Sequence, residues 1–350
     1  MATDSIARIL RAKEAGLVVV VIVLYALLAG FGGSVERDGV SVNTFLQSAN
    51  QDLLFKETAY WAIMAIGATL VIISGGIDLS IGSIYCLSAV VGAMFFQHFG
   101  PTGGGAGASG VWVLPVGVVV CLGTGAICGL LNGVMITALR VHPFIITLGT
   151  MAIYRGLAFV MTGGQTIRNF PTALTHEFIG VNISGLYPVP AIVMVLSVIV
   201  AAILMRNSVG GRYVYAIGGN ETASLYSGVR VNRVKIGVFT ISGLCGGLAA
   251  LILLGDYGSA NSNTGTGYEL NVIAASVVGG ASLSGGRGTA FGAFLGALII
   301  KLIEKAIVIF QINQEYSRII IGVVVICAVV LDRVSANLVE RRMTRAGRET

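Results

Sequence analysis

The chain has 350 residues, a net charge of +6 and a mean hydropathy of +0.88, with 55% hydrophobic but only 11% charged residues. Soluble domains carry about a quarter charged residues, so this composition excludes a soluble enzyme or binding module and predicts a multi-pass membrane protein. The positive charges fall in predicted loops and tails, where they indicate orientation in a membrane rather than binding to nucleic acid.

Ten apolar segments are candidates to cross the membrane, since a spanning α-helix needs about 20 apolar residues. The first follows three basic residues, but no clear secretory cleavage site comes after it, so it is interpreted as a retained helix. The chain is therefore predicted to be all-α: a polytopic bundle of about ten transmembrane helices in a single domain, 1–350. The predicted spans are 16–33, 58–75, 83–99, 111–138, 143–162, 188–205, 236–256, 268–284, 288–311 and 317–332.

The distribution of basic residues predicts that both the N- and the C-terminus are cytoplasmic. With the ten spans threaded in this way, 15 of the 22 lysines and arginines lie inside, four lie outside and three fall within spans. This excess agrees with the positive-inside rule. The inner regions then include Arg140, Arg287, the stretch 206–235 and the tail 333–350. The outer basic residues are Arg37, Lys56, Arg168 and Arg318.

The first polar motif, GGIDLSIGS, separates the second and third predicted spans at residues 75–83. An unpaired carboxylate near the membrane is costly, so Asp78 must find water, a donor or a cation. Its glycines permit a tight turn, and Asp78 or Ser80 can cap the next helix. Two interpretations stay open, a capped cytoplasmic turn or part of a gate. The hinge or gate candidates of this motif are Gly75, Gly76, Asp78, Ser80 and Gly82.

Two polar residues are candidates for a translocation path. Asn132 lies in GLLNGVMIT of the fourth span, and Arg155 lies near the middle of the fifth. An arginine at that depth marks a partner carboxylate, a polar cavity or a pathway. The alternative is a local irregularity of the span that brings Arg155 to the interface.

The stretch 206–235 is polar between two apolar spans, with five basic residues and a single acid, Glu221. Within it, GGNETASLYSG predicts a short helix. Asn220 is its expected N-cap, Glu221 lies in the first turn near the positive dipole end, and Gly228 ends it. A capped cytoplasmic helix held between two spans offers a docking surface.

A second glycine-rich motif, GGASLSGGRG, occupies residues 279–288 and shares GG-x-x-LS-x-G with the first. An internal repeat is one interpretation, because transporters often contain one. The other is that glycine and serine recur at any tight membrane turn. Its hinge or gate candidates are Gly279, Gly280, Gly285 and Gly286.

Charged residues near the outer ends of later spans are predicted to reach solvent. Lys301 and Glu304 can pair on one helix face, and Lys305 lies beside them. Snorkelling towards the external interface is the expected role of this cluster. Asp256 and Glu269 bracket an outer segment and are expected to be solvated.

No motif for enzymatic chemistry is present in the sequence. The phosphate-binding pattern G-x-x-x-x-G-K-[ST] is absent, so the chain cannot cradle and hydrolyse ATP by itself. Neither a nucleophile elbow nor H-E-x-x-H occurs, and the five cysteines and three histidines lack metal-ligand spacing. We therefore predict no catalytic, cofactor or metal site, and assign any ATP hydrolysis to a partner chain.

Several stretches together resemble the permease family of bacterial ABC importers for monosaccharides, the ribose-type group of the wider branched-chain amino-acid permease superfamily. They run in family order across roughly residues 60–332. The matching stretches are GGIDLSIGS, GLLNGVMIT (129–137), HPFIITLGTMAIYRG (142–156), YAIGGNETASLYSGVRVNRVK (215–235), GYELNVIAASVVGGASLSGGRGT (267–289) and IIGVVVICAVVLD (320–332). The chain departs from the pattern at Glu304–Lys305, where such permeases often carry neutral residues.

The resemblance implies a permease subunit that moves a sugar across the bacterial inner membrane by alternating access. Its implied partners are an ABC ATP-binding subunit, a periplasmic sugar-binding protein and a second permease subunit in a homo- or heterodimer. The stretch 206–235 would be the coupling loop that contacts the ATPases. Its predicted coupling residues are Gly219, Asn220, Glu221, Ala223, Ser227 and Gly228. The alternatives are an ABC permease for a polyol, an autoinducer-2-like or an amino-acid solute, and an ion-coupled secondary transporter that uses Asp78 and Arg155.

Overall fold

The computed structural model describes residues 2–330, apart from positions 38–39, 108–109, 184–185, 314, 318, 325 and 328–329. The predicted cytoplasmic tail, 333–350, lies outside the described residues. The tenth predicted span, 317–332, lies partly outside them, and the described positions between 315 and 330 are helical.

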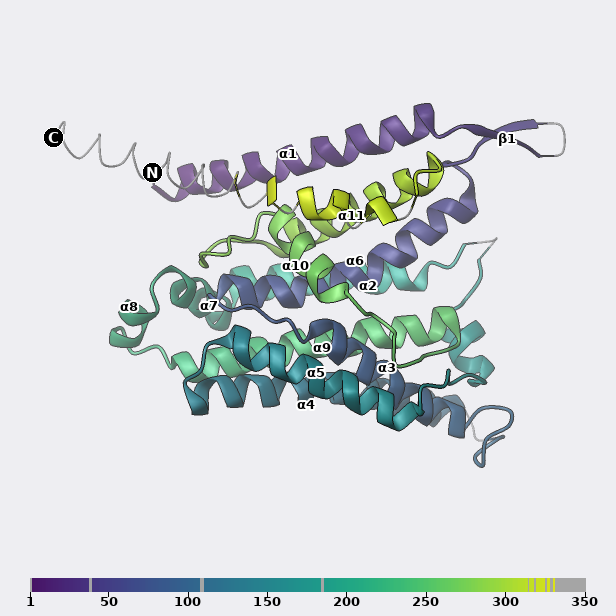
Figure 1. Cartoon of the computed structure of the whole chain (residues 1–350). Helices are drawn as coiled ribbons and strands as arrows, with labels where there is room; N and C mark the ends of the chain where they lie inside the picture. Colours follow the sequence, from purple (N-terminus) through teal and green to yellow (C-terminus); the bar gives the residue numbers. More distant parts are fainter. Residues whose placement is uncertain are drawn as a thin grey trace.

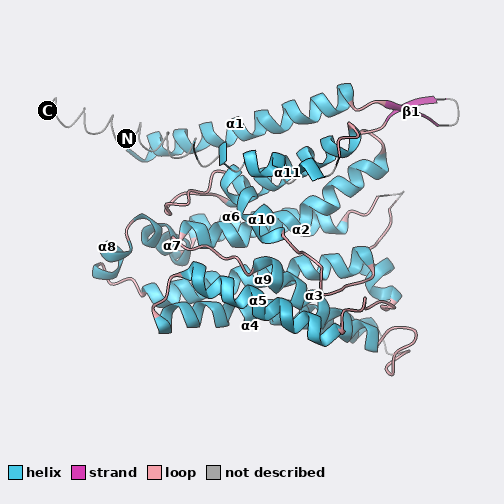
Figure 2. Ribbon diagram, viewed as in Figure 1, coloured by secondary structure: helices cyan, strands magenta, loops and turns pink. Residues whose placement is uncertain are grey.

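The described chain is a bundle of helices with one small β-hairpin at its end (Figures 1 and 2). The hairpin strands pair antiparallel, with Ser34 opposite Asn43 and Arg37 opposite Val40. The elements are α1 (Ala2–Phe31), β1 (Ser34–Arg37), β2 (Val40–Asn43), α2 (Ser48–Ile73), α3 (Ile81–His98), α4 (Gly110–Leu139), α5 (Pro143–Thr162), η1 (Ala173–Phe178), α6 (Val189–Asn207), α7 (Val209–Gly219), α8 (Glu221–Tyr226), α9 (Val231–Tyr257), α10 (Tyr268–Val278) and α11 (Ala290–Ile309).

The helical membrane fold is confirmed, and seven described helices are long and apolar enough to cross a membrane. These are α1 to α6 and α9. The total of ten spans and the cytoplasmic side of both termini stay predictions. The beginning of α1 lies at the same end of the bundle as α7 and α8 (Figure 1).

The eighth predicted span, 268–284, is not one continuous spanning helix. Its helical part, α10, has only 11 residues. At about 1.5 Å per residue it covers roughly half of a hydrocarbon core about 30 Å thick. The helix stops because Gly279 is its C-cap and Gly280 has a φ of +94°, which turns the chain away from the helical path.

The centre of the bundle is α2, in which every residue from Thr58 to Ile73 is buried. A helix that is apolar all round belongs inside a bundle, and α2 packs against α9, α11, α6 and α10.

On the other side of α9, glycines bring α4 against it at backbone distance. A Cβ at Gly125 would overlap the carbonyl oxygen of Gly243, and one at Gly129 would overlap that of Phe239. Small residues allow this close packing where lipid supplies no hydrophobic drive between helices.

Two helices, α3 and α10, begin inside the bundle instead of at its surface. The segment between α2 and α3 runs inwards from the end that carries α8, whereas the segment between α9 and α10 enters from the opposite end (Figure 1). The starts of the two helices meet. A Cβ at Gly82 would lie 2.5 Å from Oε2 of Glu269 and 3.0 Å from the carbonyl oxygen of Gly265. This meeting of two helix starts is called the central junction below.

Candidate functional site

A buried polar network surrounds the start of α3 at the central junction. Asp78 is 2% exposed, and its Oδ1 accepts hydrogen bonds from the main-chain N–H of Ser80 at 2.9 Å and from the Ser80 hydroxyl at 2.6 Å. Ser242 of α9 donates to its Oδ2 at 3.0 Å. The carboxylate therefore finds protein donors, one of the three solutions expected from the sequence.

The network continues through Ser80 to two further helices. Asn132 of α4 is fully buried and donates from Nδ2 to the Ser80 hydroxyl at 2.7 Å. Tyr154 of α5 donates to Asn132 Oδ1 at 3.3 Å and to the carbonyl oxygen of Cys128 at 3.0 Å. The chain from Ser242 to Tyr154 thus joins α9, the start of α3, α4 and α5. We refer to Asp78, Ser80, Asn132, Tyr154 and Ser242 as the Asp78 network.

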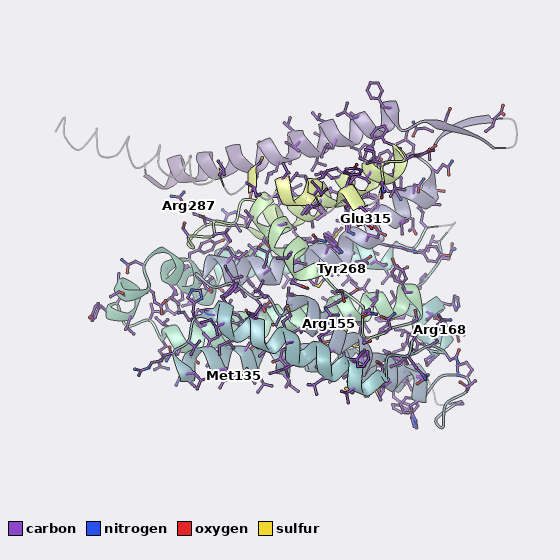
Figure 3. The ribbon with its side chains drawn as sticks, in the orientation of Figure 1. Met135, Arg155, Arg168, Tyr268, Arg287 and Glu315 are labelled. Atoms are coloured by element: carbon purple, nitrogen blue, oxygen red, sulfur yellow. The ribbon has the colours of Figure 1, made fainter. Side chains whose placement is uncertain are left out.

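Arg155 lies in the middle of the bundle, between the ends marked by Arg287 and Arg168 (Figure 3). Its guanidinium donates to the main-chain oxygens of three residues. Nη1 donates to the carbonyls of Thr264 at 2.6 Å and Ser262 at 3.3 Å, and Nη2 donates to that of Gly265 at 3.2 Å. These partners belong to the segment that leads into α10, and the role of Arg155 in a translocation path stays a prediction.

Arg155 and the Asp78 network lie on either side of the central junction. Within the part of the chain that the structure describes, no hydrogen bond or ion pair links Arg155 to Asp78. Glu269 lies between the two helix starts, and its Oε2 is buried without a hydrogen-bond partner among the described residues. The expectation that Glu269 is solvated is therefore wrong for this atom, because the start of α3 covers it.

The aromatic side chains beside the junction form a stack. The ring centroid of Tyr85 lies 6.4 Å from that of Tyr60 and 5.9 Å from that of Tyr268. The ring centroids of Trp61 and Tyr268 are 5.2 Å apart. Figure 3 shows Tyr268 close to the middle of the bundle. The sequence contained these residues but no spacing that would predict the stack, because they come from three separate helices.

Lys301 does not snorkel, which corrects the sequence-based expectation. It is 5% exposed, and its Nζ lies 3.7 Å from the ring centroid of Trp61. Nζ is also 2.8 Å from Glu304 and 3.7 Å from Glu57. The pairing with Glu304 was expected, but two carboxylates and an aromatic face hold the ammonium group inside the bundle, where pairing offsets its desolvation.

Asp256 is also held by protein contacts, contrary to its expected solvation. It forms an ion pair with Lys56 at 3.0 Å, and Lys56 pairs with Asp52 at the same distance. The Lys56 ammonium lies 3.7 Å from the ring centroid of Tyr187. This cluster ties α2, the last turn of α9 and the segment before α6 together.

The polar stretch 206–235 folds into two short helices, α7 and α8. Asn220 caps α8 as predicted, accepting a hydrogen bond from the N–H of Ala223 at 2.9 Å, and it is also the C-cap of α7. Glu221 lies in the first turn, and Gly228 follows the helix with a φ of +84°. The sequence reasoning missed α7, although Ser208 caps it in the ordinary way by accepting from the N–H of Gly211 at 2.8 Å.

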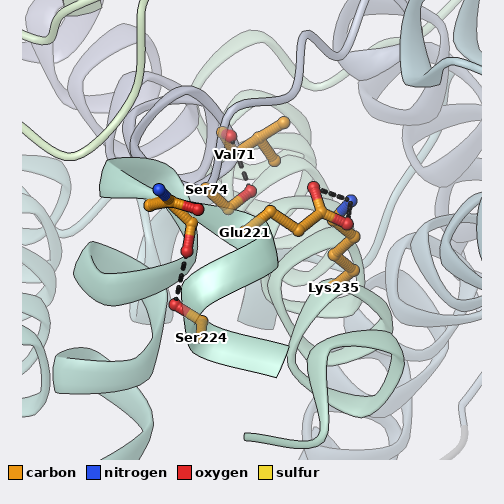
Figure 4. A network of polar contacts seen from close by, with 6 residues as sticks. Val71, Ser74, Glu221, Ser224 and Lys235 are labelled. Carbon is orange, nitrogen blue, oxygen red and sulfur yellow. Dashed lines mark hydrogen bonds and ion pairs between the residues drawn. The ribbon is translucent and has the colours of Figure 1, made fainter. Parts of the chain in front are cut away.

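An ion pair joins α8 to the rest of the chain. Lys235 Nζ lies 2.7 and 2.8 Å from the two carboxylate oxygens of Glu221, which connects α8 to the first turns of α9 (Figure 4). Within α8 itself, the Ser224 hydroxyl donates to the main-chain oxygen of Asn220, the N-cap residue, at 2.9 Å. Much of the remaining surface of α8, including Tyr226 at 85% exposure, faces outwards.

The end of α2 and the second glycine-rich motif meet at the end of α7. A Cβ at Gly218 would overlap the carbonyl oxygen of Ile73, the last residue of α2. The same oxygen accepts a hydrogen bond from the N–H of Gly286 at 2.9 Å. Tyr215 donates to the carbonyl oxygen of Gly288 at 2.7 Å, and burial raises the pKa of Tyr215 to about 12, so this donor stays protonated at neutral pH.

Among the predicted hinge glycines, the backbone separates two groups. Positive φ angles occur at Gly75, Gly280, Gly285 and Gly286, where the chain turns tightly. Gly82 lies inside α3, and its small size instead admits Glu269. The two motifs differ in course as well, because the first leads into the centre of the bundle and the second closes a loop against α7.

Comparisons with known proteins agree over most of the chain. The sequence pattern of the family described as "Branched-chain amino acid transport system / permease component" matches residues 52–329. The chain is 39% identical over 291 residues to the ribose import permease protein of Bacillus subtilis (strain 168), covering 83% of this chain and 86% of the relative.

Two further relatives carry other names. An autoinducer 2 import system permease protein of Enterobacter sp. (strain 638) is 33% identical over 88% of this chain and 84% of its own length. The D-allose transport system permease protein of Escherichia coli (strain K12) is 32% identical over 89% of this chain and 90% of its own length. No solved structure is significantly similar to the chain.

Proposed function

The chain belongs to the family of branched-chain amino acid transport system permease components, and we propose that it is the transmembrane permease subunit of an ABC importer for a sugar. The observation that carries this proposal is its 39% identity to a ribose import permease over 86% of that protein's length. A second relative is named for the transport of D-allose, which is also a monosaccharide and supports a sugar as the solute. The membrane is proposed to be the inner membrane of a bacterium.

The chain is proposed to transport without catalysing a reaction of its own. ATP hydrolysis is assigned to a partner ATP-binding subunit, since the sequence has no phosphate-binding loop. A periplasmic sugar-binding protein would deliver the solute, and a second permease subunit, identical or related, would complete the transporter.

We propose that α7 and α8 transmit movement of the ATPases to the bundle. The supporting observation is their position: α8 is exposed at one end, while Gly218 of α7 contacts both Ile73 and the loop that contains Gly286. A displacement of α8 would therefore act on the end of α2 and on the second glycine-rich motif together. The proposed coupling residues are Gly219, Asn220, Glu221, Ala223, Ser227 and Gly228.

The central junction is the proposed gate region. Helices that begin at mid-depth, with their N-terminal ends together, are a recurrent arrangement around solute sites in transporters. Asp78, Asn132 and Arg155 hold the segments that lead into α3 and α10. Alternating access would require these segments to change their contacts, so we assign the hinge role to them and to the turn glycines of both motifs.

Reconstitution in liposomes with the ATP-binding subunit and the binding protein tests this function. We expect uptake of labelled ribose or D-allose that requires ATP and the binding protein. Uptake that survives ATP depletion but stops with an uncoupler would instead establish an ion-coupled secondary transporter. Uptake of autoinducer 2 with no monosaccharide uptake would favour the second candidate solute, which the name of one relative supports.

A further inference from the structure

An apolar groove of about 940 Å³ opens on the bundle between α6 and α9. Its floor includes Ile63 and Leu70 of α2, the helix against which both α6 and α9 pack. Val200 and Leu204 of α6 line it and are 54% and 53% exposed. Apolar side chains this open along a spanning helix indicate a surface in contact with lipid chains.

The groove follows most of α9 and begins at its first turn. Along α9 it extends from Arg230 to Leu248, roughly 27 Å at about 1.5 Å per residue. Helix α9 has 27 residues, so at the same rise it is about 40 Å long and its ends extend beyond a hydrocarbon core of about 30 Å. The first turn of α9 therefore lies where lipid phosphates are found.

Positive charge is concentrated at this mouth of the groove. Arg230 and Arg233 both line it, and in the described part of the chain neither guanidinium has a hydrogen bond or an ion pair. Lys235, the next basic residue, is already paired with Glu221. Arg230 is also the N-cap of α9 and provides no side-chain cap, so the positive end of a long helix faces the same place.

We propose that this groove binds an anionic glycerophospholipid, with an acyl chain along α2 and the phosphate at Arg230 and Arg233. No carboxylate is found among the described residues that line the groove, so its charge complements an anion. Basic pockets between spanning helices at the cytoplasmic side are suited to such headgroups. The cytoplasmic location rests on the proposed function, whereas the binding itself can be measured without transport.

The site adjoins the proposed coupling region. Gly228 at the end of α8 and Gly211 of α7 line the same groove. A lipid seated there would contact α7, the turn that follows α8 and the start of α9. The inference therefore adds a lipid requirement to the segment proposed to meet the ATPases.

Native mass spectrometry of the full-length protein in neutral detergent tests the site, with dioleoylphosphatidylglycerol as the probe and dioleoylphosphatidylcholine for comparison. We expect the wild-type chain to retain phosphatidylglycerol preferentially. Arg230→Gln and Arg233→Gln should each lower the affinity for phosphatidylglycerol about fivefold, and the double variant should lower it about 25-fold. The reason is that one basic residue near an anionic headgroup raises the affinity by about fivefold. Arg212→Gln, on α7 but outside the lining, should change binding less than about twofold.

A second variant tests the acyl part of the groove. Gly237 lines it, and a Cβ there would meet nothing within 4 Å, so Gly237→Phe introduces a large side chain at an open position of the groove. Gly149→Phe, on α5 and equally open, is its matched control. We expect loss of bound phosphatidylglycerol for Gly237→Phe alone.

Three results would overturn the proposal. The double arginine variant could bind phosphatidylglycerol as well as the wild type does, or Arg212→Gln could lose as much binding, which would show a general surface charge effect. Alternatively, Gly237→Phe could dissociate a dimer while its lipid count stays the same, which would make the groove an interface between copies. If Gly237→Phe does not fold, the arginine variants alone decide.

Discussion

Arg155 of α5 donates a hydrogen bond to the main-chain oxygen of Thr264 at 2.6 Å, across 109 positions of sequence. The same guanidinium contacts the carbonyls of Ser262 and Gly265. A charged side chain inside a membrane protein is costly unless it is paired, and here three main-chain acceptors satisfy it. The relationship fixes the segment that leads into α10, which would otherwise expose unpaired carbonyls at mid-depth.

Replacing Arg155 should therefore damage both folding and transport. Hydrogen bonds to charged groups contribute about 1.5–3 kcal/mol, so we expect Arg155→Ala to lower the free energy of unfolding by about 2–3 kcal/mol and to stop uptake. Thermal unfolding in detergent and uptake in liposomes measure the two effects. Arg168→Ala, at an exposed position, is the control. Wild-type stability and uptake of Arg155→Ala would rule out its structural role.

Asn132 should be coupled energetically to Ser80. Its amide bridges the Ser80 hydroxyl and Tyr154, and its removal leaves buried groups unpaired at a cost of about 1–3 kcal/mol. A double-mutant cycle of Asn132→Ala and Ser80→Ala should give unfolding free energies that do not add, because both variants break the same bond. Thr124→Ala serves as the control, since that hydroxyl bonds only to its own helical turn. Strict additivity would contradict the Asp78 network.

Gly218 and Gly219 should respond differently to a methyl group. A Cβ at Gly218 would overlap the oxygen of Ile73, whereas one at Gly219 would meet nothing within 4 Å. We expect Gly218→Ala to lower the free energy of unfolding by about 1–3 kcal/mol through forced separation of the two backbones. Gly219→Ala should stay within about 0.5 kcal/mol of the wild type. Equal melting temperatures for the two variants would show that α7 does not pack tightly on α2.

Reversing the charge of Glu221 tests the proposed coupling role of α8. The ion pair with Lys235 is partly exposed, with the Glu221 side chain at 54%, so it contributes about 0–1 kcal/mol to stability. We expect Glu221→Arg to leave the protein in the membrane but to abolish uptake and co-purification of the ATP-binding subunit.

Three variants complete the test of α8. Ala223→Pro should act like Glu221→Arg, because it removes the N–H that Asn220 caps. Lys235→Met removes the ion pair but keeps Glu221, so it distinguishes a role of Glu221 in the ion pair from a direct contact with the ATP-binding subunit. If Lys235→Met abolishes uptake to the same extent as Glu221→Arg, Glu221 acts through the ion pair. Glu36→Arg carries the same charge reversal in the β1–β2 hairpin, at the opposite end of the bundle (Figure 1), and should leave uptake intact. Normal uptake and ATPase association in both Glu221→Arg and Ala223→Pro would disprove the coupling role.

Long helices and local caps were predictable because their signals lie close together along the chain. The predicted fifth span coincides with α5, and Asn220 and Gly228 were recognised at the two ends of α8. The failures concern side chains whose surroundings come from distant elements. Lys301 was expected to reach the interface, yet Trp61, Glu57 and Glu304 enclose it.

The sequence alone determined that this chain is a helical membrane protein and that it lacks the motif G-x-x-x-x-G-K-[ST], since hydropathy and short motifs can be seen along the chain itself. Its ordered motifs also indicated the family. The tertiary structure alone decided that α3 and α10 begin at the same place, that Arg155 holds main-chain carbonyls, and that the second glycine-rich motif meets α7 and the end of α2. The physical reason is that a buried polar group takes whichever partner the packing brings within hydrogen-bond distance, and local sequence does not specify that partner.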